Sequence, residues 1–139
     1  MPDQISFVLD SYALIGYLEN ESFSDQIEDI LTQARKGNYR LYLHVIQLGE
    51  VYYNTLREQG QDLADLVYAK IKSFPCHLIQ YIDEKLLIKA ATLKANYPIS
   101  YADSFAAALA IINNCQLLSG DPEFKILEKR GIINIEWLE

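Results

Sequence analysis

Short apolar runs alternate with longer amphipathic segments along the whole chain. The run at 5–9 is β-branched and aromatic and stops at Asp10, which predicts a buried strand. The segment 24–36 repeats its apolar residues at helical spacing between Ser24, a candidate N-cap, and Gly37, a candidate terminator. The same criteria predict four further strands, over 39–43, 77–81, 116–118 and 132–135. They also predict helices over 11–18, 45–59, 62–74, 84–96 and 122–130, and one that begins at Ser100. In the helix over 62–74, the residues expected to face the core are Leu63, Leu66, Val67 and Ile71.

This alternation of strands and helices predicts an α/β fold. We expect a three-layer sandwich, with a mostly parallel five-stranded central sheet and helices on both of its faces. The 139 residues contain no repeat, low-complexity tract or long linker, so they are expected to form a single domain over 1–139. In such a sheet the carboxyl ends of the strands and the N-termini of the crossover helices lie at one edge, where open α/β sheets bind their ligands.

Four acidic residues are predicted to converge on that edge. Asp10 ends the first strand, and Asp121 follows the fourth strand after a Ser-Gly turn. Asp103 lies in the first turn of its helix, about 5 Å from the helix start, and Glu50 lies about 9 Å along the helix that follows His44. All four carboxylates are therefore expected at one edge of the sheet.

Each acid also has a local explanation. Asp121 fits an N-cap before a proline at N1, and Asp103 fits the acidic partner of Ser100 in a capping box. Asp10 fits a cap of the helix after it, and Glu50 fits a solvated helix position. Their joint placement favours a site, because like charges gathered at one edge repel unless a cation lies between them. A cluster of carboxylates without His or Cys suits one or two Mg²⁺ or Mn²⁺ ions.

The charge and the cysteine content narrow the class of protein. A formal net charge of −7 argues against a protein that holds nucleic acid by a general basic surface, but it permits binding of a phosphodiester through metal ions. Only His44 and Cys115 could join Cys76 and His77, so a zinc site is not expected. Two cysteines, no apparent signal peptide and no apolar run of about 18 residues predict a cytoplasmic protein without a membrane span.

The segments that carry these acids resemble a known family. Val-Leu-Asp-Ser-Tyr-Ala-Leu-Ile (8–15), Leu-Gly-Glu-Val (48–51), Tyr-Ala-Asp-Ser-Phe-Ala-Ala-Ala (101–108) and Leu-Leu-Ser-Gly-Asp-Pro-Glu-Phe (117–124) occur in the order and spacing of a PIN domain. The chain is most similar to the VapC-like ribonuclease toxins of prokaryotic toxin–antitoxin pairs. One departure is His44, where family members often have a Ser or Thr that opens the Glu-bearing helix. By this resemblance, the acidic metal-binding positions are Asp10, Glu50, Asp103 and Asp121, and Ser119 matches the Ser or Thr that supports the last of them.

The resemblance implies metal-assisted hydrolysis of an RNA phosphodiester bond. It implies that Asp10, Asp103 and Asp121 are direct or water-mediated ligands, and that Glu50 is either a ligand or the residue that orients the attacking water. Asn54 and Glu123 are weaker candidates for a supporting role, with a solvated helix face as the favoured alternative for each.

The resemblance also implies two protein partners: an antitoxin that occludes the site and a second copy of the chain, in a homodimer or a larger oligomer. The segment 41–56, with Tyr42, Tyr52 and Tyr53, is more apolar and aromatic than one strand and one helix face require. An interface and ordinary core packing both explain such tyrosines.

Two alternatives belong to other classes. A catalytically silent PIN fold would only bind RNA or protein, and the retention of all four acids counts against it. A phosphoacceptor receiver domain would carry adjacent acids after its first strand and a lysine after its last. Here Asp10 is followed by Ser11, and the last strand leads into Glu136 and Trp137.

Overall fold

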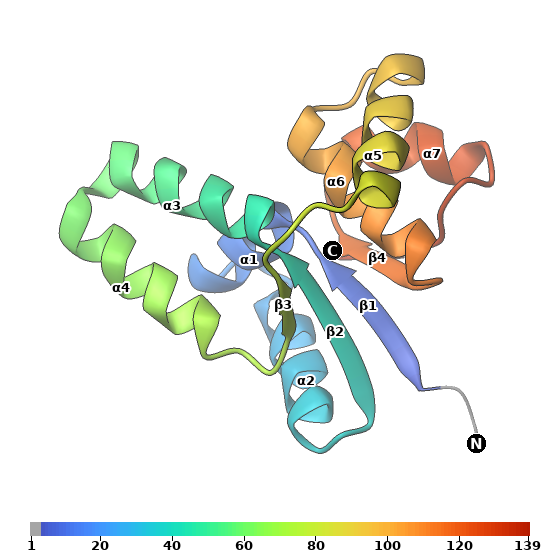
Figure 1. Ribbon diagram of the computed structural model, residues 1–139. Coiled ribbons are helices and arrows are strands. Elements are labelled where there is room, and N and C mark those ends of the chain that lie inside the picture. Colours follow the sequence, from blue (N-terminus) through green and yellow to red (C-terminus); the bar gives the residue numbers. More distant parts are fainter. Residues whose placement is uncertain (1–3) are drawn as a thin grey trace.

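A single parallel sheet forms the centre of the protein. The computed structural model describes residues 4–139, and within that range five strands pair in the order β3-β2-β1-β4-β5, each pair parallel (Figure 1). The strands are β1 (Ile5–Leu9), β2 (Tyr39–His44), β3 (His77–Ile79), β4 (Gln116–Ser119) and β5 (Ile135–Trp137). The predicted α/β fold with a five-stranded sheet is therefore confirmed.

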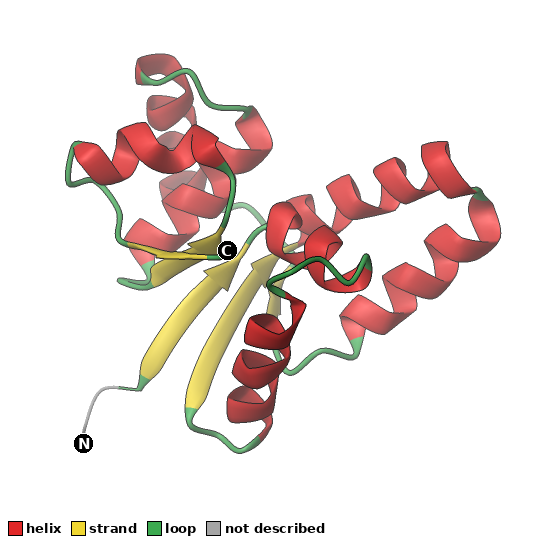
Figure 2. Ribbon diagram, turned by 180° about the vertical axis from the view of Figure 1, so that it is seen from behind, coloured by secondary structure: helices red, strands yellow, loops and turns green. Residues whose placement is uncertain are grey.

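Helices cover both faces of this sheet (Figures 1 and 2). Residues 4–139 form seven α-helices: α1 (Ser11–Leu18), α2 (Ser24–Arg35), α3 (Val45–Gln59), α4 (Gln61–Lys72), α5 (Glu84–Asn96), α6 (Tyr101–Ile112) and α7 (Lys125–Lys129). A 3₁₀ turn, η1 (Pro122–Phe124), precedes α7, so the helix predicted over 122–130 is divided in two. In the part of the chain that is described, no helix has the length and apolar character needed to span a bilayer.

The alternation of side chains along β1 separates two hydrophobic cores. Phe7 and Leu9 pack with α1, α2 and α3 on one face of the sheet. Val8 packs with α5, α6 and α7 on the other face. Because successive side chains of a strand point to opposite faces, one five-residue strand contributes to both cores. The sheet is thus the middle layer of three, as expected from the sequence.

The α3–α4 hairpin extends away from the sheet beside its β3 edge (Figures 1 and 2). Ile71 is buried at the base of this hairpin, but Leu66 is 65% exposed, so the prediction that Leu66 faces the core is wrong. The tyrosines singled out in segment 41–56 have different surroundings. Tyr42 packs against the core of the α5–α7 face, and Tyr52 donates a hydrogen bond to Asp65 of α4, whereas Tyr53 is 49% exposed.

Some element boundaries differ from the predicted ones. The last strand was expected over 132–135, but Ile133 fills the core beneath α7 and the strand begins at Ile135. Strand β3 ends at Ile79, short of the predicted 81. Helix α2 begins at Ser24 itself, whose hydroxyl donates to Asn20, so Ser24 is not the N-cap.

The order of the strands creates a topological switch point between β1 and β4. From β1 the chain builds β2 and β3 on one side, and it then returns to place β4 on the other side of β1. The carboxyl ends of β1 and β4 lie next to each other, since Leu9 pairs with Leu118. Asp10 directly follows the first of these strands, and Asp121 follows the second after one residue, Gly120. Open α/β sheets bind ligands at such a point.

Candidate metal centre

Asp10 is fully buried at the junction of β1 and α1. One carboxylate oxygen accepts a hydrogen bond from the backbone N–H of Ala13 at 2.8 Å, so Asp10 is the N-cap of α1. The other oxygen accepts a hydrogen bond from the hydroxyl of Ser119 at 2.5 Å. The local explanation as a cap is correct, and the carboxylate is also bound to the neighbouring strand.

Ser119 connects two of the predicted acids. Its hydroxyl donates to Asp10 and accepts a hydrogen bond from the backbone N–H of Asp121 at 3.0 Å. Asp121 then caps η1, because its Oδ1 accepts from the N–H of Glu123 at 2.9 Å. One hydroxyl therefore fixes the end of β1 against the turn that follows β4.

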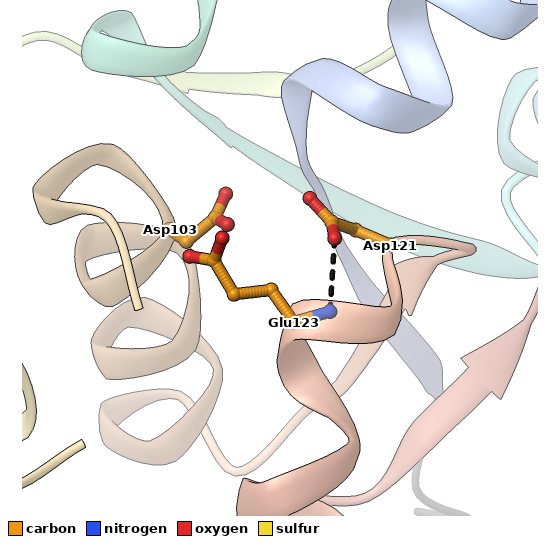
Figure 3. Close-up of side chains that lie close together, drawn as sticks. All are labelled: Asp103, Asp121 and Glu123. Carbon is orange, nitrogen blue, oxygen red and sulfur yellow. Dashed lines mark hydrogen bonds between the residues drawn. The ribbon is translucent and has the colours of Figure 1, made fainter. Parts of the chain in front are cut away.

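Three carboxylates face one another across this turn (Figure 3). Each of Asp103, Asp121 and Glu123 has an oxygen within 4.8 Å of the others, with Asp103 buried and the other two half-buried. Asp103 comes from the first turn of α6, and the other two come from the β4–η1 connection (Figure 3). The structure therefore brings Asp103 and Asp121 together, and it adds Glu123, for which a solvated face was the favoured explanation.

The N-terminus of α6 is capped in a way that frees Asp103. Ser100 is the N-cap as predicted, and its hydroxyl accepts from the N–H of Asp103 at 3.1 Å. In a capping box the carboxylate three residues later would return a hydrogen bond to the N–H of Ser100. That N–H instead donates to Glu123. The assignment of Asp103 to a capping box is therefore wrong, and its carboxyl group faces the other acids.

Glu50 lies at the edge of this group. It is half-buried on α3 and accepts a hydrogen bond from the hydroxyl of Ser11, the residue after Asp10. It is not one of the three carboxylates within 4.8 Å of one another. Asn54, one turn further along α3, accepts from Arg57 at 3.1 Å, and within residues 4–139 it makes no hydrogen bond to an acid.

His44 caps the helix that carries Glu50. Its Nδ1 accepts the backbone N–H of Ile46 at 3.0 Å, and its Nε2 lies 3.1 Å from the carbonyl oxygen of Tyr81. These contacts require the tautomer with a proton on Nε2, since Nδ1 must accept. Burial lowers the pKa of His44 and keeps the ring neutral. The imidazole thus replaces the Ser or Thr hydroxyl expected at this position.

The buried acids are electrostatically strained. Burial raises the pKa of Asp10 to about 7, against the lowering effect of the Ser119 and Ala13 hydrogen bonds, and the charge of Asp121 adds to the rise. Burial also raises the pKa of Asp103, as do the contact with Glu123 and the charges of the surrounding acids. Within residues 4–139 the one ion pair joins Arg35 to Glu28 on α2, so no lysine or arginine neutralises the cluster.

This arrangement has the chemistry of a hard-cation site. Its donors are all oxygens, and no other charge of the described chain compensates the cluster. Mg²⁺ and Mn²⁺ prefer carboxylate ligands of this kind, and a divalent ion would offset the repulsion among the carboxylates. The residues therefore fit such an ion, with Asp103, Asp121 and Glu123 closest to one another and Asp10 behind them.

Glu123 and Gln47 were not identified as central residues from the sequence. The only local signal for Glu123 is its place two residues after Asp121, inside a single 3₁₀ turn. Gln47 is fully buried and hydrogen-bonded to the backbone of Ser11 and of Ala102. No spacing in the sequence marks it as different from other polar helix residues.

Comparisons with known proteins agree with the fold. The profile of the family described as "PIN domain" matches residues 7–130. No curated protein sequence matches the chain.

Several solved structures share the fold. VapBC2 from Rickettsia felis, bound to a DNA fragment from its promoter, superposes with a TM-score of 0.76 and 14% identity, covering 97% of this chain and 100% of that chain. DNA-bound VapBC from Salmonella typhimurium gives a TM-score of 0.71 and 16% identity, with coverage of 96% and 98%. VapBC-1 from nontypeable Haemophilus influenzae gives a TM-score of 0.67 and 17% identity, and the match again covers 96% of this chain and 98% of that chain.

Proposed function

This chain belongs to the PIN domain family, and from that premise we propose that it is a Mg²⁺- or Mn²⁺-dependent endoribonuclease, the toxin of a type II toxin–antitoxin pair. The observation that carries the proposal is the cluster of Asp103, Asp121 and Glu123, with oxygens within 4.8 Å of one another at the switch point of the sheet. Asp10 extends the cluster through Ser119. A binding module that never held a cation would gain nothing from this repulsion.

In the proposed mechanism the chain holds the cation and positions water and substrate. Asp103, Asp121 and Glu123 would hold the ion, and Asp10 would add negative charge from its buried position. When bound, Mg²⁺ or Mn²⁺ supplies stabilisation of charge on the phosphoryl oxygens and activation of water. Glu50, held by Ser11 beside the cluster, either joins the ligands or orients the attacking water.

The proposed substrate is RNA, and the proposed protein partners are an antitoxin and a second copy of the chain. The antitoxin is supported by the VapBC complexes that share this fold. It is further supported by a largely apolar groove between α1 and the α3–α4 hairpin, lined by Ile15, Leu18, Val51, Leu63, Leu66 and Val67 among others. Exposed apolar grooves of this kind bind partner segments. Both cysteines are free thiols, in line with the proposed action in the cytoplasm.

Cleavage of RNA by the purified chain tests the proposal. We expect cleavage in Mn²⁺ or Mg²⁺, none in EDTA, and a loss of at least a hundredfold in Asp103→Asn. Asp62→Asn is the matched control, because Asp62 is also an acid in the first turn of a helix, α4, but lies outside the cluster. Equal cleavage in chelator, or a wild-type rate in Asp103→Asn, would refute the metal mechanism. Mn²⁺ binding without any RNA cleavage would favour the silent PIN module.

A further inference from the structure

Gln47 joins the two helix starts that carry Asp10 and Asp103. Its side chain is 0% exposed in the first turn of α3. Its Oε1 accepts the N–H of Ser11 at 2.9 Å, and its Nε2 donates to the carbonyl of Ala102 at 2.7 Å. These backbone groups belong to the residue after Asp10 and the residue before Asp103. One buried amide therefore spans from α1 to α6.

This connection completes a closed set of links among the three aspartates. Ser119 ties Asp10 to Asp121 by its hydroxyl. Glu123, two residues after Asp121, connects that turn to the start of α6 by accepting a hydrogen bond from the N–H of Ser100. Gln47 provides the remaining connection, between the helix start that carries Asp103 and the one that follows Asp10. Without it, α1 and α6 would be held together only through the β4–η1 connection and by packing.

We propose that Gln47 is a positioning residue of the metal centre, which sets the distance and orientation of Asp10 relative to Asp103. This inference rests on the proposed function of the site. A buried amide that lost either partner would leave a polar group unsatisfied, so both hydrogen bonds hold its side chain in one conformation. Outer hydrogen bonds of this kind orient the ligands of metal sites.

Helix capping alone accounts for only half of this arrangement. Ser11 is the first residue of α1, and its N–H has no partner inside the helix, so Gln47 Oε1 is a cap for it. Ala102 lies in the first turn of α6, where carbonyl groups already have a partner within their own helix. The hydrogen bond from Gln47 to Ala102 is thus not needed to complete α6. It satisfies the buried amide of Gln47 and, in the proposed role, holds the two helix starts together.

Isothermal titration calorimetry of the full chain with Mn²⁺ tests the inference. Gln47→Met keeps the length of the side chain and removes both hydrogen bonds. We expect its Kd for Mn²⁺ to rise at least about tenfold, the usual effect of losing an outer hydrogen bond at a metal site. RNA cleavage should fall by a similar factor at limiting Mn²⁺ and recover at saturating Mn²⁺. Because Mn²⁺ also stabilises the folded chain, this recovery is informative only beside a core variant that is destabilised to the same extent.

Two controls separate positioning from stability. Thr55→Val removes a hydrogen bond to Val51 within the same helix, and Leu31→Val loosens the core away from the site. Both should bind Mn²⁺ as the wild type does. If Gln47→Met does not fold, Gln47→Asn, which is too short to span both partners, takes its place in the same comparison.

The outcomes distinguish the two proposals. A folded Gln47 variant with wild-type Mn²⁺ affinity overturns the positioning role and leaves the proposed function standing. Weaker binding in the Gln47 variant and in Leu31→Val alike also overturns it, because the effect would then follow stability. A wild-type chain that binds no Mn²⁺ overturns the metal mechanism, and the positioning role falls with it.

Discussion

Acidification should stabilise the metal-free protein, in contrast to the usual destabilisation of proteins by acid. The pKa of Asp10 is raised from 3.8 to about 7 in the folded state, chiefly by burial. The folded chain therefore binds this proton more tightly than the unfolded chain does. By linkage, the free energy of unfolding rises as the pH falls through about 7 and continues to rise until about 4. This added stability is lost again as the pH increases through the same window.

The size of the effect follows from the same values. One pH unit corresponds to about 1.4 kcal/mol. Protonation of Asp10 therefore raises the free energy of unfolding by about 2 kcal/mol between pH 7 and pH 5.5, and by about 4 kcal/mol over the whole window. The raised pKa of Asp103 acts in the same direction. For a chain of this size, 2 kcal/mol corresponds to an increase in Tm of about 6 °C.

Urea unfolding in EDTA at pH 8.0, 7.0, 6.2 and 5.5 measures this dependence. In Asp10→Asn the free energy of unfolding should depend less on pH, because this variant lacks the buried carboxyl group that binds the proton. Saturating Mn²⁺ should stabilise the wild type most at pH 8.0, where the acids are ionised. A metal-free wild type whose stability stays constant or falls between pH 8.0 and 5.5 would refute the assignment of a strained buried carboxylate to Asp10.

Three further substitutions test other parts of the structure. Asp103→Asn should be as stable as the wild type or more stable in EDTA, because repulsion is relieved. It should lose most of the Mn²⁺ stabilisation, which for the wild type is about 2.7 kcal/mol at a hundredfold excess over Kd; a variant that keeps the full thermal shift contradicts the ligand role. Gly120→Ala places a Cβ 2.6 Å from the ring of Tyr12 and 3.0 Å from the carbonyl oxygen of Leu138, so either the Tyr12 ring or the turn before Asp121 must shift. A destabilisation of about 1–3 kcal/mol in urea, with at least tenfold slower cleavage, is expected, and unchanged values for both would show that the turn is free to adapt. His44→Ala removes the cap of α3 and His44→Ser restores a capping oxygen. Their free energies of unfolding should differ by about 1 kcal/mol in favour of Ser, and equal stability would show that the cap contributes nothing.

The fold and the position of the site were predictable because they follow from local patterns. Buried strands and amphipathic helices show their periodicity in the sequence, and a parallel sheet brings the strand ends to one edge. Asp10, Asp103 and Asp121 were placed correctly by this argument. The burial of Leu66 was not, because helical spacing identifies an apolar face but does not reveal what covers it.

The detailed connections of the site depend on contacts between distant segments. Glu123 reaches the N–H of Ser100, and Gln47 reaches Ser11 and Ala102. Glutamate and glutamine are common on helix surfaces, so neither residue type signals such a contact. Only the packing of α1, α3, α6 and η1 against one another gives these side chains their partners.

The pairing of β1 with β4 also determines when the site can form as the chain is made. Asp10 is synthesised near the start, but its partner hydroxyl, Ser119, arrives only after nearly all the other strands and helices. Domains fold as units, and long-range pairings such as this one form late. A nascent chain, or one broken before β4, would carry Asp10, Glu50 and Asp103 without the turn that completes the cluster. Under the proposed function, the chain would therefore lack a complete metal centre until its synthesis is almost finished.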